Sequence, residues 1–228
     1  MVFMILSFFL LLHSVYAHDL WIEKEGERYT LYYGHRYSSH KGKNIIRYNP
    51  EIIESALCVD RNGNIRSLKI VKRYPIKLRS KCSIIYINLS PQYWTKTPYG
   101  TVNKEKNDVR MPINSWISYE GVKRIESWNK ELTKPFKNGI DIIPVIDPFS
   151  LDVGEKLRLL ITFNGKPVEN VAVAYDGRFR GMTDRKGRIN VRIKHKGLQF
   201  VEATYRVKIN SEKADEILYT LTLNFEIK

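Results

Sequence analysis

The sequence is poor in cysteine and in acidic residues, and each scarcity excludes a class of protein. Two cysteines in 228 residues are too few for a small disulfide-stabilised scaffold or a four-cysteine zinc site. No loop rich in Asp or Glu offers the oxygen ligands that calcium or magnesium sites require. Beyond residue 12 no segment is apolar enough to cross a membrane. With 43% hydrophobic residues the composition is nevertheless that of a globular protein, which excludes a disordered or collagen-like chain.

A dense apolar run does occur at the N-terminus, at residues 1–12. Its length is that of the hydrophobic region of a signal peptide, and Val15 and Ala17 occupy the −3 and −1 positions of a typical cleavage site. The segment lacks the usual preceding Lys or Arg, so an uncleaved anchor or a buried strand stays as an alternative. We expect a signal peptide at 1–17 with cleavage after Ala17, and therefore a periplasmic or secreted protein.

Short segments with period-two alternation of β-branched and aromatic residues dominate the rest of the chain. Stretches with helical period are scarce, so we predict a mainly β protein. We also expect one or two short helices in the N-terminal part, at Tyr48–Ala56, where Pro50-Glu51 is typical of a helix start, and at Ser115–Leu132.

Two prolines, Pro144 and Pro148, bracket a stiff connector and predict a domain boundary there. We therefore expect two β-sandwich-like domains, an N-terminal metal-binding β domain at 18–145 and a C-terminal sandwich at 146–228. In the second, Asn164-Gly165 and Thr183–Gly187 are typical of hairpin turns between strands. This half shows no residues arranged for chemistry.

The two cysteines, Cys58 and Cys82, each lie in strand-like sequence. In an oxidising compartment they could form a disulfide between neighbouring strands, which would contribute roughly 3 kcal/mol for a loop of this length. Two buried free thiols remain the alternative, because cysteine is often simply buried.

Cleavage after Ala17 would leave His18 at the N-terminus of the mature chain. The α-amine and Nδ1 of an N-terminal histidine can close a chelate ring on one metal ion. Protons compete only weakly for this amine at neutral pH, because its ordinary pKa is about 7.7–8.0. A third nitrogen could come from the amide of Asp19 or from another imidazole.

Two further histidines, His35 and His40, follow closely. Three of the four histidines of the expected mature chain therefore lie within its first 23 residues, 18–40. Five positions apart, they could not share one face of a straight strand, but the Ser and Gly residues around them make a bend possible. The candidate metal ligands are therefore His18, His35, His40 and the carboxylate of Asp19. His195 lies among basic residues and is expected to be a solvated turn residue.

The ligand types indicate which metal would bind. Nitrogen-rich square-planar or tetragonal sites suit Ni(II) and Cu(II), and the Irving–Williams order makes Cu(II) the tightest binder when nothing else selects. Zinc would need a closed tetrahedron, which these residues do not supply.

Several segments resemble a known family. HDLWIE at 18–23, YGHRYSSHKG at 33–42 and YWTKTPYGTVNKEKND at 93–108 are similar to a secreted bacterial family, the periplasmic components of ABC-type (energy-coupling) cobalt/nickel transport systems, or nickel uptake transporter family proteins. GKPVENVAVAYDG and GMTDRKGRI, at 165–177 and 181–189, resemble prealbumin-like and carboxypeptidase-regulatory-like β-sandwiches. The first resemblance implies delivery of Ni(II) or Co(II) to a membrane permease without catalysis, with His18, His35 and His40 at the metal.

The formal charge of +14 would repel dissolved cations at long range, so any metal must be held by local chelation. No nucleic-acid-binding motif accompanies the basic residues, and we expect no nucleic acid partner. An anionic envelope surface is the more natural partner for an exported basic protein.

The alternative function is a copper-binding histidine-brace protein, either a CopC-type carrier or an oxidative copper enzyme. An envelope adhesion or structural module without metal is a further alternative.

Overall fold

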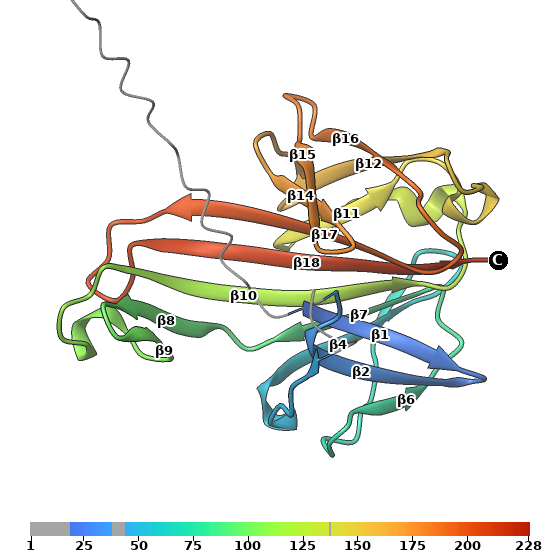
Figure 1. Cartoon of the computed structure of the whole chain (residues 1–228). Helices are drawn as coiled ribbons and strands as arrows, with labels where there is room; N and C mark the ends of the chain where they lie inside the picture. Colours follow the sequence, from blue (N-terminus) through green and yellow to red (C-terminus); the bar gives the residue numbers. More distant parts are fainter. Residues whose placement is uncertain (1–18, 38–43, 137) are drawn as a thin grey trace, which may run out of the picture.

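The computed structural model describes residues 19–37, 44–136 and 138–228, and these form three β-sheets (Figure 1). The mainly β prediction is confirmed. The helical segments of the described residues are four 3₁₀ turns: η1 (Pro50–Ile52), η2 (Lys106–Asp108), η3 (Lys130–Thr133) and η4 (Pro148–Ser150). Among the same residues no helix has the length and hydropathy needed to span a bilayer.

A ten-stranded central sheet organises the molecule. Along its main path the strands follow in the order β15 (Arg178–Met182), β14 (Ala172–Tyr175), β17 (Gly197–Lys208), β18 (Glu216–Ile227), β10 (Asn114–Ile125), β7 (Ile84–Leu89), β4 (Ile53–Val59) and β5 (Ile65–Ser67). The hairpin β8 (Gln92–Thr97) and β9 (Gly100–Val102) continues the sheet beside the first half of β10. The long strands β10, β17 and β18, together with the β8–β9 hairpin, extend well beyond the two smaller sheets (Figure 1).

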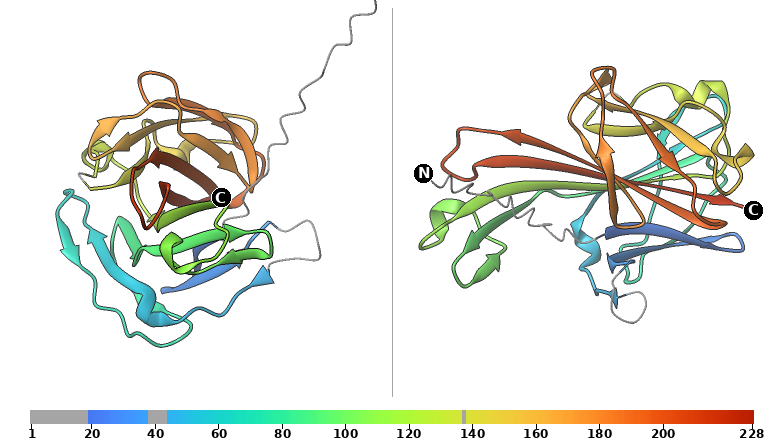
Figure 2. Two further views of the ribbon diagram at one scale, coloured as in Figure 1. Left: turned by 90° about the vertical axis from the view of Figure 1, so that its left-hand side faces the viewer. Right: turned by 45° about the horizontal axis from the view of Figure 1, so that its top comes forward.

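Two smaller sheets cover opposite faces of the central sheet. The first outer sheet contains β1 (Asp19–Glu25), β2 (Arg28–His35), β3 (Asn44–Ile45) and β6 (Lys77–Arg79). The second contains β11 (Ile140–Pro144), β12 (Lys156–Phe163), β13 (Lys166–Pro167) and β16 (Arg188–Arg192). The views in Figure 2 show the two outer sheets on either side of the long strands.

Alternation along the central strands explains this three-layer arrangement. On β18, Leu223 and Phe225 point into the core beneath the second outer sheet, whereas Asn224 between them accepts a hydrogen bond from the backbone N–H of Ile22 on β1. On β7, Ile85 and Ile87 belong to the core beneath the first outer sheet, separate from the core that contains Tyr86. A central strand of this kind is buried on both faces.

Burial on both faces explains why the helix predicted at Ser115–Leu132 was wrong. Residues 115–132 form most of β10 and then η3, because β10 lies between β18 and β7 and carries buried side chains on both faces. A strand covered on both sides loses the clean polar alternation by which strands are recognised. The expected helix at Tyr48–Ala56 is reduced to η1, after which β4 begins at Ile53.

The central sheet crosses the predicted boundary near residue 145. Strand β18 pairs in parallel with β10, from Trp116–Glu216 to Arg124–Asn224, and β11 pairs with β12 across the boundary itself. The parts before and after residue 145 thus share sheets rather than meeting only through a connector. Cys58 on β4 and Cys82 just before β7 form a disulfide, which joins two neighbouring strands of the central sheet.

A buried ion pair connects β10 to the second outer sheet. Lys123 Nζ lies 2.8 Å from Asp141 Oδ1 and donates to the Ile142 carbonyl at 2.9 Å, and both charged side chains are almost fully buried. Asp141 also accepts hydrogen bonds from the Tyr86 hydroxyl and from the backbone N–H of Phe136.

Replacing Lys123 by Met should lower the free energy of unfolding by about 3–5 kcal/mol, because Asp141 would keep a buried charge without its cation. Lys134→Met is the matched control: its pair with Glu131 is exposed, so it should cost less than about 1 kcal/mol. Urea denaturation of both variants measures the difference, and equal stabilities would contradict the importance of the buried pair.

Candidate functional site

The first described residue, Asp19, begins β1 and lies opposite Gly34 of β2 in the strand pair. Its carboxylate accepts a hydrogen bond of 2.8 Å from the backbone N–H of Arg36, just beyond the end of β2. Burial raises the pKa of Asp19, and the Arg36 hydrogen bond and the charge of His35 oppose that rise. The structure therefore brings two of the predicted ligands, Asp19 and His35, to the same end of the first outer sheet.

Aromatic packing holds this end of the sheet against the central sheet. The Arg36 guanidinium pairs with Glu23 and lies over the rings of Trp21 and Tyr37. The Tyr37 ring contacts Phe200 of β17 edge-on, with centroids 5.7 Å apart. Tyr37, two residues after the end of β2, is thus placed beside β17.

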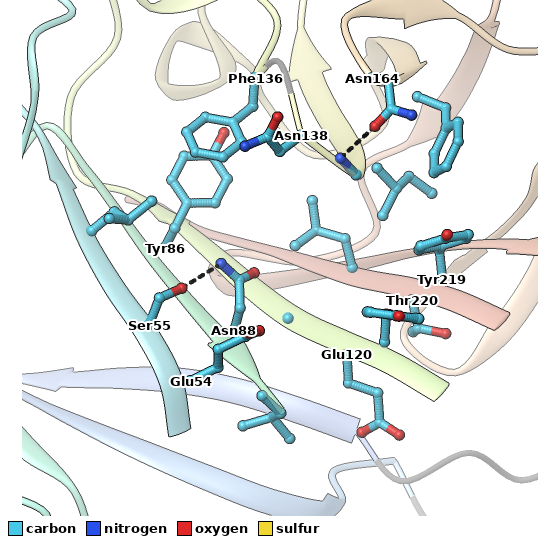
Figure 3. Close-up of a pocket in the computed structure, with 18 residues that line it drawn as sticks. Glu54, Ser55, Tyr86, Asn88, Glu120, Phe136, Asn138, Asn164, Tyr219 and Thr220 are labelled. Carbon is cyan, nitrogen blue, oxygen red and sulfur yellow. Dashed lines mark hydrogen bonds between the residues drawn. The ribbon is translucent and has the colours of Figure 1, made fainter. Parts of the chain in front are cut away.

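Two glutamates of the central sheet, Glu120 on β10 and Glu202 on β17, extend the negative charge of Asp19. Both lie on the face toward β1, flanking β18, where Glu120 is opposite Thr220 and Glu202 is opposite Thr222. In Figure 3 the Glu120 side chain points toward the start of β1. We call Asp19, Glu120 and Glu202 the carboxylate cluster.

The pKa values report how closely these groups interact. Burial raises the pKa of Glu202 to about 7, the negative charge of Asp19 raises it further, the Thr204 hydroxyl opposes the rise, and the charge of Glu120 adds to it. Burial also raises the pKa of Glu120, although the Ser118 hydroxyl donates to it at 2.7 Å. The second oxygen of Glu120, Oε2, is buried and has no hydrogen-bond partner among the described residues.

The predicted ligands His18 and His40 lie outside the described residues. Within 19–37, 44–136 and 138–228, no three His, Cys, Asp or Glu side chains come close enough together to hold a metal ion. A complete metal site cannot therefore be assembled from the described residues alone. The Nε2 of His195 is 2.9 Å from Asp176, and its ring stacks on Tyr175.

Glu120 and Glu202 are absent from the candidates that the sequence suggested. Glu202 interrupts the apolar segment Phe200–Thr204, and a charged residue within a buried strand is an unusual feature that could have marked it. Glu120 was hidden by the helix predicted over 115–132. Their proximity to Asp19 depends on the pairing of β10, β18 and β17, which is not visible in the local sequence.

The raised pKa of Glu202 makes a prediction about stability. A folded-state pKa of about 7, against an ordinary 4.5, means that the folded protein binds this proton more tightly than the unfolded chain. Its contribution to stability is therefore present below about pH 4.5 and is lost as the pH rises toward 7. With a metal chelator present, the free energy of unfolding of Glu202→Gln should exceed that of the wild type at pH 8 by up to about 3 kcal/mol. This difference should vanish near pH 4.5.

Urea denaturation at the two pH values measures this change, with the exposed Glu212→Gln as control. An advantage of Glu202→Gln that is equal at both pH values would contradict the electrostatic explanation.

Comparison with known proteins gives a family without an assigned activity. Residues 15–207 match the family described as Domain of unknown function (DUF4198). No curated protein and no solved structure matches the chain significantly. Because the matched region covers far more than half of the chain, the protein belongs to the DUF4198 family.

Proposed function

We propose that this protein is an exported metal-binding accessory protein that chelates Ni(II) or Co(II) through a mature N-terminal His18 and passes it to a membrane transporter. The observation that carries the proposal is the carboxylate cluster at the start of β1. In a chain with a formal charge of +14, Asp19, which follows His18, and Glu120 lie close enough to Glu202 for their negative charges to raise its pKa. Such a concentration of negative charge favours a cation.

The proposed ligands divide into two groups. His18 would supply two nitrogens, from its α-amine and its Nδ1, and His35 or His40 a third. Asp19 is the proposed oxygen ligand, and its hydrogen bond from Arg36 orients its carboxylate at the end of β1. Glu120 and Glu202 would offset the positive charge of the metal without having to bind it directly.

The compartment and the partner are part of the same proposal. The Cys58–Cys82 disulfide is in keeping with an oxidising compartment such as the periplasm. The excess of basic residues would favour the anionic envelope surface next to a membrane permease, where the cargo metal would be transferred.

Metal titration of the exported protein tests the proposal. Intact mass should show His18 as the first residue, and calorimetry should show one tight site for Ni(II) or Co(II). One extra residue before His18 should weaken binding by about a hundredfold or more, because it separates the amine from the imidazole that together close the chelate ring.

Variants of the two described ligands separate their roles. His35→Ala and Asp19→Ala should each weaken binding by at least about tenfold. His195→Ala is the matched control and should leave binding unchanged, since that ring is held by Asp176 and Tyr175. Absence of stoichiometric binding, or binding unaffected by the N-terminal extension, would overturn the proposal.

Tighter binding of Cu(II) than of Ni(II) would not by itself favour the copper alternative, because the Irving–Williams order predicts it for most nitrogen sites. Peroxide- or oxygen-dependent oxidation by the copper-loaded protein would favour it.

A further inference from the structure

A cavity of about 510 Å³ is lined by Tyr86, Asn88 and Tyr219, on the face of the central sheet that carries the second outer sheet (Figure 3). Its floor is formed by β4, β7, β10 and β18, and its wall by the segment before β11 and the turn that ends β12. This volume lies within the range of small-molecule sites. Neither the disulfide nor the proposed metal ligands line it.

Aromatic rings line the cavity on two sides. Tyr86 and Phe136 are stacked with centroids 4.9 Å apart, and on the other side Tyr219 stacks on Tyr119 at 5.1 Å and contacts Phe163 at 4.7 Å. Figure 3 shows Tyr86 and Phe136 together and Tyr219 across the cavity from them. Tyr119 is 37% exposed, so the second group of rings remains accessible from solvent.

Amide side chains lie between the two groups of rings. Asn88 donates to the Ser55 hydroxyl at 3.0 Å, and the Oδ1 of Asn164 accepts from the backbone N–H of Gly139 at 2.8 Å. Each bond fixes one end of the amide, which orients the other end, Oδ1 of Asn88 or Nδ2 of Asn164. Asn138 contributes a third amide to the lining.

The charge of the lining restricts the ligand. Although the sequence has 38 Lys and Arg, none is among the described residues that line this cavity. The carboxylates there are those of Glu54 and Glu120, and the Glu120 side chain points away toward β1 (Figure 3). The described lining residues therefore offer an anionic ligand no positively charged partner.

Gly121 keeps the floor of the cavity open. A Cβ at this position would lie 2.6 Å from Oδ1 of Asn88 and 3.3 Å from the Ile87 carbonyl oxygen. Any larger residue would displace the Asn88 amide, so the orientation of that amide depends on glycine at this point of β10.

From these observations we propose that the cavity binds a neutral saccharide. A sugar ring presents C–H faces that pack on aromatic rings and hydroxyl groups that exchange hydrogen bonds with planar amides, and it carries no charge that would require a cation. Tyr219 and Phe163 would contact the ring face, and Asn88 and Asn164 the hydroxyl groups. This proposal is independent of the metal site, which lies on the other side of the sheet.

Binding of four neutral trisaccharides tests the proposal: maltotriose, cellotriose, xylotriose and chitotriose. In the presence of a metal chelator, calorimetry and saturation-transfer NMR should detect binding of at least one of them, with ring protons closest to the protein. Tyr219→Ala should weaken that binding by at least about tenfold, whereas Tyr219→Phe should retain it.

Two further variants make the result specific. Asn88→Ala should weaken binding through loss of a hydroxyl partner, and Tyr99→Ala should not, because Tyr99 is 91% exposed in the β8–β9 turn and outside the cavity. Circular dichroism confirms that each variant is folded. Failure of all four sugars to bind, or stronger binding of triglucuronate or of a neutral tripeptide, would overturn the proposal. So would binding that Tyr219→Ala leaves unchanged.

Discussion

Two adjacent cations on β10, Lys123 and Arg124, join the three layers of this protein. They point to opposite faces of the central sheet: Lys123 reaches Asp141 and the Ile142 carbonyl of the second outer sheet, whereas Arg124 donates to the Ile22 carbonyl of the first. Arg124 also pairs with Glu126 and Glu226. A buried cation is tolerated only with partners of good geometry, so these contacts also fix where each outer sheet lies on the central one.

This placement positions both proposed sites. Because Arg124 and Asn224 hold β1 against β10 and β18, the start of β1 comes to lie beside Glu120 and Glu202. Lys123 holds β11 over the other face, where the segment before β11 and the turn that ends β12 form the wall of the aromatic cavity. The carboxylate cluster and the aromatic cavity thus lie on opposite faces of β10, where Glu120 and Gly121 are adjacent in sequence.

Local sequence predicted the strand content and the turns at Asn164-Gly165 and Thr183–Gly187, since these depend on neighbouring residues. It also singled out Asp19 and His35, which do lie together. It failed at β10, where burial on both faces removes the alternation that indicates a strand. Because β10 was predicted as a helix, Glu120 was missed as a site residue. The cavity could not have been predicted at all, because Tyr86, Tyr119, Phe163 and Tyr219 come from four strands that meet only through long-range pairing.

The parallel pairing of β10 with β18 has a consequence for how the chain acquires its structure. About ninety residues separate the two strands, and β18 follows all the other described strands along the chain. Closing so long a loop is entropically costly, and contacts of this separation form slowly. During synthesis from the N-terminal end, the disulfide partners, 24 positions apart, can meet early, whereas the central sheet stays divided until β18 has been made. Until then β10 has an unpaired edge, and the chain is most exposed to aggregation and to proteases.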